Sequence, residues 1–274
     1  MCWGLTASVA MVGVGTAAAV VATRQRRPTA VPLVLGYFTL MEALQAIGYL
    51  VVDECANPLN QSVAFLSVVH IIFQPFFVNA FAMEFVPKPV RLKARLAVYG
   101  VCAMSAVFML AQLYPFDWAG VCRQGSTLCG PALCTVSGEW HIGWEVPFNG
   151  LMSPIEQALG FHAAFPTYAI AAFVAPICYG AWRFAIFHAL IGPILASLLT
   201  DNANEMPAIW CLFSIGIIAV GLNPWLWRRF ELKPLAASWR SIGNGLSSGA
   251  VEPGGRSSRI MKSLGQTLRG QGTD

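Results

Sequence analysis

Residues 62–86 read SVAFLSVVHIIFQPFFVNAFAMEFV, and this stretch decides the fold. It exceeds the ~20 mainly apolar residues that a helix needs to cross a bilayer core of about 30 Å. Glu84 is its only acidic residue, and it contains no lysine or arginine. Because its apolar residues run on without the alternation of a membrane β-barrel strand, we predict a transmembrane helix.

Much of the remaining chain repeats this pattern. Six further apolar stretches qualify as spans: about 3–22, 29–52, 96–116, 157–181, 184–200 and 207–227. Of the 274 residues, 56% are hydrophobic and 11% are charged, whereas soluble domains carry about 25% charged residues. This composition excludes a soluble globular enzyme, a disordered chain and a nucleic-acid-binding domain. We therefore predict an all-α membrane protein, a seven-transmembrane-helix bundle over residues 1–230.

The basic residues predict the orientation of this bundle. If the N-terminus lies outside, every lysine and arginine except Arg123 falls in an inner segment, as the positive-inside rule requires. The outer segments then collect acidic residues, among them Asp53, Glu54 and Asp201. We predict the N-terminus out and the C-terminus in, with the inner face of the protein against anionic lipid of the bilayer.

Four cysteines fall in the predicted outer loops: Cys55, Cys122, Cys129 and Cys134. An even number of cysteines on the oxidising side predicts two disulfides, in one of three connectivities. One pair would tie the 53–61 loop to the 117–156 loop. A four-thiolate zinc site is the alternative, but the Cys-x6-Cys-x4-Cys spacing differs from the Cys-x2-Cys of a zinc knuckle.

Two segments outside the spans have a character of their own. The outer loop 117–156 is far longer than usual connections, and it carries several tryptophans, which favour the membrane interface. It predicts a disulfide-pinned cap, with a passive lid as the alternative. The tail 231–274 is rich in Gly, Ser and Arg, and this composition predicts a basic, flexible cytoplasmic segment.

The run from Asp201 to Pro207, before the last predicted span, is typical of a helix N-terminus.

Polar side chains inside the spans are candidates for a site, because an ionisable group there costs about 2.5–3.5 kcal/mol to insert. Five lie in the outer halves of spans: Glu42, Gln45, His70, Gln74 and His162. By depth alone, we expect them to meet in one cavity beneath the cap. His141 and Glu145 of the outer loop, four residues apart, would close this cavity from above.

This predicted cavity fits two chemistries. Glu42, His70 and His162 together would offer a metal one carboxylate and two imidazoles, with a position open for water. The same groups could instead pass protons. The alternative to both is a buried hydrogen-bond network that fixes the packing of the helices. Since the histidines are far apart in the sequence, we expect no cofactor, and a metal ion on these three residues remains the weaker hypothesis.

A second polar group lies near the inner ends of the spans: Asn79, Glu84, Arg183 and His188. Together the outer and inner groups occupy opposite depths of the bundle, as a transport path requires. The alternative is that long side chains reach the interface and that the shorter ones bond across helices.

Several runs of the sequence are familiar: GYFTLMEALQAIGY (36–49), HIIFQPFFVNAFAMEF (70–85), LYPFDWAG (113–120), TVSGEWHIGWEVPFNG (135–150) and NEMPAIWCLFSIGI (204–217). Through them the chain resembles an uncharacterised bacterial family of multi-pass membrane proteins, over about residues 1–230. The resemblance implies the cell inner membrane, with periplasmic outer loops and a cytoplasmic tail. It implies no mechanism.

Three functions are compatible with these observations. We expect an integral inner-membrane protein that binds or transports a small solute or proton through the outer-half polar cavity. The first alternative is an intramembrane metal-dependent hydrolase. The second is a non-enzymatic accessory or assembly subunit, whose cap and tail dock to membrane-protein partners.

Overall fold

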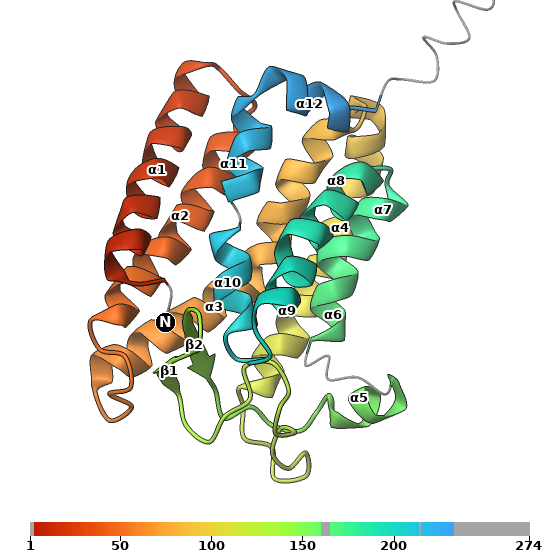
Figure 1. Ribbon diagram of the computed structural model, residues 1–274. Helices are drawn as coiled ribbons and strands as arrows, with labels where there is room; N and C mark the ends of the chain where they lie inside the picture. Colours follow the sequence, from red (N-terminus) through yellow and green to blue (C-terminus); the bar gives the residue numbers. More distant parts are fainter. Residues whose placement is uncertain (1–2, 160–164, 214, 233–274) are drawn as a thin grey trace, which may run out of the picture. The chain divides into compact units, whose positions relative to one another are not determined.

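The computed structural model describes residues 3–159, 165–213 and 215–232, which belong to the first of two units of the chain, Met1–Leu232. This unit is mostly helical (Figure 1). Five of its helices are long and apolar enough to cross a membrane, and they coincide with five of the predicted spans. They are α1 (Leu5–Arg24), α2 (Ala30–Tyr49), α3 (Pro58–Ala82) with the 3-10 turn Met83–Phe85, α4 (Lys88–Gln112), and Trp182–Leu199.

The last of these five helices is divided. It consists of α8 (Trp182–Ala189), a π-helical turn (Leu190–Ile194) and α9 (Leu195–Leu199). Gly192 has non-helical backbone angles, and Pro193 follows it. Proline cannot donate the helical hydrogen bond, so the helix bends at this point.

The two other predicted spans differ from expectation. In place of 157–181 the structure has α5 (Ser153–Leu159) and a shorter apolar helix, Pro166–Cys178, made of α6 (Pro166–Ala169), a π-helical turn (Ile170–Val174) and α7 (Ala175–Cys178). In place of 207–227 it has α10 (Met206–Leu212) and α11 (Ile215–Leu222), followed by α12 (Pro224–Phe230) at an angle of 96°. Asn223 causes this break, since its side chain caps α12 by accepting from the Trp225 and Leu226 N–H groups. The count of seven crossings therefore stays a prediction.

The long helices α1, α2, α3 and α4 alternate in direction along the bundle (Figure 1). The connection between α2 and α3 and the connection before α10 lie at one end of the bundle, which we call the cap end. The connection between α1 and α2, the start of α8 and the helix α12 lie at the other, which we call the basic end. There the Arg27 guanidinium donates to the Leu222 carbonyl at 2.9 Å, and that of Arg183 to the Arg229 carbonyl at 3.1 Å.

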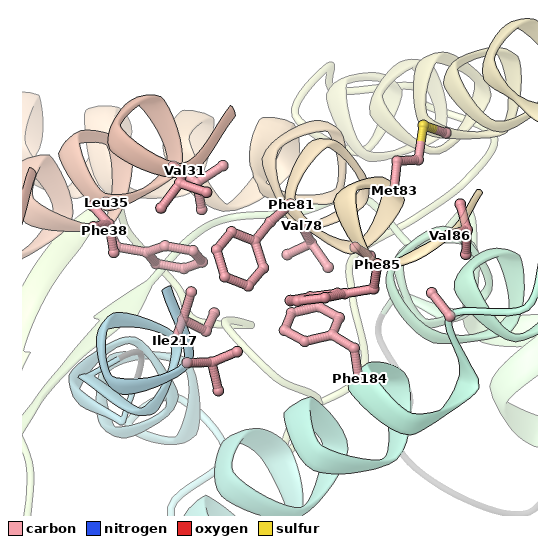
Figure 2. Close-up of a cluster of buried hydrophobic side chains, with 14 of the residues drawn as sticks. Val31, Leu35, Phe38, Val78, Phe81, Met83, Phe85, Val86, Phe184 and Ile217 are labelled. Carbon is pink, nitrogen blue, oxygen red and sulfur yellow. The ribbon is translucent and has the colours of Figure 1, made fainter. Parts of the chain in front are cut away.

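An aromatic core holds the helices together at the basic end. Phe81, Phe85 and Phe184 are each about 1% exposed or less, and Figure 2 shows their rings gathered between α3 and α8, with Val31 of α2 and Ile217 of α11 beside them. The Phe81 and Phe184 ring centres are 5.3 Å apart, as are those of Phe81 and Phe85. Large apolar side chains thus join helices that are distant in the sequence.

The predicted cap contains β-structure, which the all-α prediction did not include. Strands β1 (Cys134–Ser137) and β2 (Ile142–Glu145) form an antiparallel hairpin in which Cys134 pairs with Glu145. Ile142 and Trp144 of β2 are fully buried, in one cluster with Met41 of α2. The hairpin therefore contributes to the hydrophobic core at the cap end of the bundle, and this favours the pinned cap over a passive lid.

Both cysteine pairs in the cap lie at disulfide distance. Cys55 pairs with Cys134 and Cys122 with Cys129, with Cα atoms 4.9 Å and 6.0 Å apart. The first pair joins the 53–61 loop to the 117–156 loop, as expected for one of the two disulfides, and the second closes a short turn within the cap.

Two polar side chains next to the first disulfide also hold β1. The buried Asn60 amide donates to the Thr135 carbonyl at 2.9 Å and accepts from the Thr135 N–H at 2.8 Å. The Asp53 carboxylate accepts from the N–H and the hydroxyl of Ser137 at 2.8 Å and 2.6 Å. Strand β1 is therefore fixed to the turn between α2 and α3 along its whole length.

Glu205 attaches the other side of the hairpin. Its carboxylate is fully buried and accepts from three consecutive backbone N–H groups: those of Glu139 at 3.0 Å, Trp140 at 2.6 Å and His141. The Thr200 hydroxyl adds a fourth bond at 2.9 Å. A Cβ atom on Gly138 would come within 2.6 Å of the Glu205 carboxyl carbon, so glycine is required there. The sequence placed Glu205 at a helix start, and α10 does begin at Met206, but the carboxylate binds the hairpin.

We predict that Glu205→Gln destabilises the cap. The amide would turn an N–H donor toward backbone donors and would lose the charge-assisted bonds, at a cost of about 2–4 kcal/mol. Thermal unfolding in detergent should show a lower Tm, and limited proteolysis should cut faster within 117–156. Glu139→Gln removes the same charge from an exposed side chain of the same hairpin and should change neither. Equal effects of the two variants would refute the role given to Glu205.

Candidate functional site

The polar side chains that the sequence grouped by depth lie in several separate places. Glu42 and Gln45 face α10, His70 lies between α2 and α3 on another side of α2, and Gln74 lines a cavity beneath the cap. His162 lies outside the described residues. The following paragraphs take these places in turn.

Glu42 is buried in the half of α2 nearer the cap end, with only 3% of its surface exposed. Neither of its carboxylate oxygens has a hydrogen-bond partner among the described residues. One turn later, Gln45 donates to the Ala208 carbonyl of α10 at 3.4 Å, and its own side-chain oxygen is also unpartnered within the described chain. The pair therefore presents three oxygen acceptors that no described donor satisfies.

His70 lies on the side of α2 that faces away from Glu42. Its Nε2 atom donates to the Tyr37 carbonyl at 2.7 Å, and its ring stacks on the Tyr37 ring with centres 3.8 Å apart. Tyr37 precedes Glu42 by five residues, which is about 140° around a helix. His70 also lines an apolar groove with Leu40 and Leu44 of that same face of α2. The sequence predicted that His70 and Glu42 meet because they lie at the same depth of the bundle. In the structure they are apart, because their side chains point to different sides of α2.

The proposed metal ligands are only partly within the described chain. His162 belongs to residues 160–164, which the structure does not describe. Over the residues that it does describe, no group of three His, Cys, Asp or Glu side chains is placed to hold a metal ion. The metal hypothesis for Glu42, His70 and His162 thus gains no support from the structure.

His141 and Glu145 do not act together above a cavity. A spacing of four residues brings side chains together on a helix, but these two residues flank and end strand β2, where residues are extended. His141 is buried, and its Nδ1 atom accepts from the Ile142 N–H at 2.8 Å and lies 3.3 Å from the Tyr49 hydroxyl. Desolvation lowers the pKa of His141 to about 3. His141 is therefore neutral and joins the cap to α2, while Glu145 is partly exposed.

The residues predicted as an inner cluster have separate local partners. Asn79 donates to the Pro75 and Ala171 carbonyls, each at 2.8 Å, and accepts from the Tyr179 hydroxyl at 3.1 Å. This is the cross-helix bonding that was the alternative for Asn79.

The other three members of that group also each bond to a partner outside the group. Glu84 forms an ion pair with Arg91 at 2.5 Å. Arg183 donates to the Arg229 carbonyl, and His188 accepts from the indole N–H of Trp210 at 3.2 Å. Their partners lie on different elements, so the structure does not bring the four residues together in one cluster.

A cavity of about 380 Å³ lies beneath the cap, between α3, α6, α10 and the bend before α9. Its lining is largely apolar and aromatic: Ile71, Gln74, Thr127, Leu128, Phe165, Tyr168, Ala169, Phe173, Pro193, Met206, Pro207 and Trp210. Gln74 is the one residue of this lining that the sequence singled out. Tyr168 and Trp210 carried no signal, because a tyrosine and a tryptophan in apolar helices are common packing residues.

Trp210 is held rigidly at one wall of this cavity. Its indole nitrogen lies against Gly192, at the bend between α8 and α9, where a Cβ atom would clash with the ring. The Trp210 ring also packs on Phe173 and against the edge of Tyr168, at centre distances of 5.7 Å and 5.4 Å. The bend at Gly192 therefore makes room for the indole that shapes the cavity.

Two polar atoms at the cavity lack partners among the described residues. They are the Nε2 atom of Gln74 and the hydroxyl oxygen of Tyr168, which are both buried. Gln74 is 2% exposed and Tyr168 is 5% exposed. A buried polar group without a partner costs about 1–3 kcal/mol, so this arrangement would be relieved by a ligand that brings hydrogen-bonding atoms of its own.

Comparison with known proteins gives a family without a known activity. No curated protein and no solved structure matches the chain. A family model does match it, over residues 6–231, which include every helix and strand described above and leave out the tail. The expectation of an uncharacterised family is thereby confirmed. Since the match covers most of the chain, this protein belongs to the family of unknown function DUF5765.

Proposed function

We propose that this protein is an integral inner-membrane protein that binds a small, mostly apolar solute in the cavity beneath its cap. In this proposal the cap end faces the periplasm and the basic end faces the cytoplasm. The apolar helices support insertion into a membrane. The arginines at one end and the disulfide-distance cysteine pairs at the other support the orientation.

The observation that carries the proposal is the unpartnered pair of Gln74 and Tyr168 in an apolar cavity. A volume of about 380 Å³ lies within the usual range of roughly 300–1,000 Å³ for ligand sites. The acyl chain of a lipid could fill the apolar part, but it has no atom that could bond to the Gln74 amide or the Tyr168 hydroxyl. The solute therefore has an apolar body with at least one hydrogen-bonding group at its inner end.

A second candidate function is proton binding at Glu42. The Glu42 carboxyl and the Gln45 oxygen offer acceptors without described donors, and an ionised carboxylate without a partner is very costly in an apolar interior. We propose that Glu42 carries a proton, which it could donate to the Gln45 oxygen one turn along α2. Binding and release of this proton would make the α2–α10 interface sensitive to the proton gradient.

We predict that Tyr168→Phe weakens solute binding without destabilising the protein. The test uses 10-bromodecan-1-ol, an apolar chain with one hydroxyl, which quenches nearby tryptophans such as Trp210. In nanodiscs the wild-type protein should show saturable quenching, and Tyr168→Phe should require about tenfold more probe, the equivalent of one hydrogen bond of about 1.4 kcal/mol. 1-Bromodecane, which lacks the hydroxyl, should not distinguish the two proteins.

Tyr179→Phe is the matched control for this experiment. The Tyr179 hydroxyl lies outside the cavity lining and bonds to Asn79 at 3.1 Å. Its removal should lower the Tm, because Asn79 loses a donor, and should leave the quenching curve unchanged. Identical quenching by Tyr168→Phe and the wild type would contradict the assignment of the cavity.

For Glu42 we predict labelling by dicyclohexylcarbodiimide, a lipophilic reagent that modifies protonated carboxyl groups in apolar surroundings. Mass spectrometry of the membrane-inserted protein at neutral pH should find the adduct on Glu42. The labelling should fall as the pH rises, because the reagent needs the protonated form. Glu84, which forms an ion pair with Arg91, should stay unlabelled as an internal control, and Glu42→Gln should abolish the adduct. Labelling of Glu84 but not of Glu42 would overturn the proton hypothesis.

A further inference from the structure

A groove at the basic end lies between the start of α2, the end of α3 and the first turns of α4. It has a volume of about 360 Å³. Its polar part is lined by Lys88, Arg91 and Arg95, and its apolar part by Met83, Leu92 and Tyr99. The groove is separate from the cavity beneath the cap, with which it shares no lining residue.

The basic side chains of this groove are in excess over the acidic ones. Lys88, Arg91 and Arg95 follow one another at intervals of three and four, so they lie on one face of α4. Glu84, the acidic residue of the lining, is paired with Arg91 at 2.5 Å. Lys88 and Arg95 have no carboxylate within ion-pair distance over the part of the chain that the structure describes. The groove thus carries a positive charge that the described protein does not neutralise.

The position of these residues on α4 is unfavourable for the helix itself. Lys88 and Arg91 lie in the first turn, which contains no acidic residue. The N-terminus of a helix carries a partial positive charge and disfavours cations. A bound anion would offset both the helix dipole and the basic side chains, so the arrangement favours anion binding rather than helix stability.

Below its basic part, the groove continues into apolar surface. The Tyr99 ring stacks with that of Phe76 at a centre distance of 6.0 Å. Phe76 also lines a second, almost wholly apolar groove of about 600 Å³ along α2 and α3, together with Leu40 and Phe73. Leu92 is 62% exposed and Leu40 is 53% exposed, which leaves both grooves open along the side of the helices. Positive charge above a long apolar groove matches the outline of a phospholipid with a negative headgroup.

We propose that this surface binds one anionic phospholipid of the inner leaflet. Its phosphate contacts Lys88 and Arg95, and an acyl chain follows the apolar groove past Tyr99 and Phe76. The inference rests on the proposed insertion and orientation of the protein in the membrane, but not on the solute in the cavity beneath the cap. The sequence predicted only a general attraction between the basic segments and anionic lipid at the inner face. The proposal assigns one lipid-binding site, formed by α2, α3 and α4.

The test measures lipid binding to the full chain in nanodiscs of phosphatidylcholine with one tenth phosphatidylglycerol. Native mass spectrometry counts the phosphatidylglycerol retained after release. Because a basic residue near a membrane surface contributes roughly 1 kcal/mol to anionic-lipid binding, we expect Lys88→Gln and Arg95→Gln each to lower retention about fivefold. Lys93→Gln removes the same charge from an exposed position of α4 that does not line the groove, and it should retain the wild-type amount.

Two outcomes would overturn the proposal. Equal loss in Lys93→Gln and Lys88→Gln would show a diffuse attraction of charge instead of a site. Displacement of the lipid by millimolar glycerol 3-phosphate would show that the groove binds a free phosphate ester and that the apolar part plays no role. Insertion into nanodiscs is measured first for every variant. If the proteins insert but Lys88→Gln and Lys93→Gln retain equal amounts of phosphatidylglycerol, the lipid site alone is wrong. If the wild-type protein does not insert, the proposed membrane function is wrong as well.

Discussion

The structure of the cap end depends on one buried carboxylate. Glu205 accepts from three successive N–H groups of the hairpin turn and from Thr200. A hairpin of two short strands is marginally stable alone, so its attachment to the first residue before α10 gives it a fixed place. The Cys55–Cys134 pair and Asn60 hold the opposite strand. Between these attachments, Trp144 is buried in the hydrophobic core, so the cap packs as part of the helical unit.

This fixed cap gives the bundle two different compartments in the half nearer the cap end. Beneath the cap, the bend at Gly192 admits Trp210 and leaves a cavity whose polar atoms, on Gln74 and Tyr168, have no described partner. At the α2–α10 interface, Glu42 is enclosed with Gln45. The first arrangement suits a ligand and the second suits a proton. Because α10 carries residues of both and directly follows Glu205, a change at one place has a direct structural route to the other.

The basic end is organised by different forces. Aromatic packing of Phe81, Phe85 and Phe184 fixes the helices there. The arginines and lysines of this end lie outside this core: Arg27 and Arg183 bond to backbone carbonyls, Arg91 pairs with Glu84, and Lys88 and Arg95 have no acidic partner among the described residues. Burial thus supplies the stability of this end, and the charges are left to interact with what surrounds the protein. The groove on α4 is the place where such charges adjoin exposed apolar surface.

The sequence by itself determined five of the apolar helices, the end of the bundle where basic residues gather and the four cysteines that pair, because hydropathy and charge act locally along the chain. It also identified Glu42 and Gln74 as costly buried groups. The tertiary structure alone decided which side chains meet. The sequence placed His70 and Glu42 at one depth, but His70 of α3 packs against Tyr37, on a different face of α2 from Glu42. Glu205 binds a hairpin about 65 residues away, a contact that no local pattern encodes. A helix fixes depth through its rise, whereas the direction of each side chain follows from the packing of its neighbours.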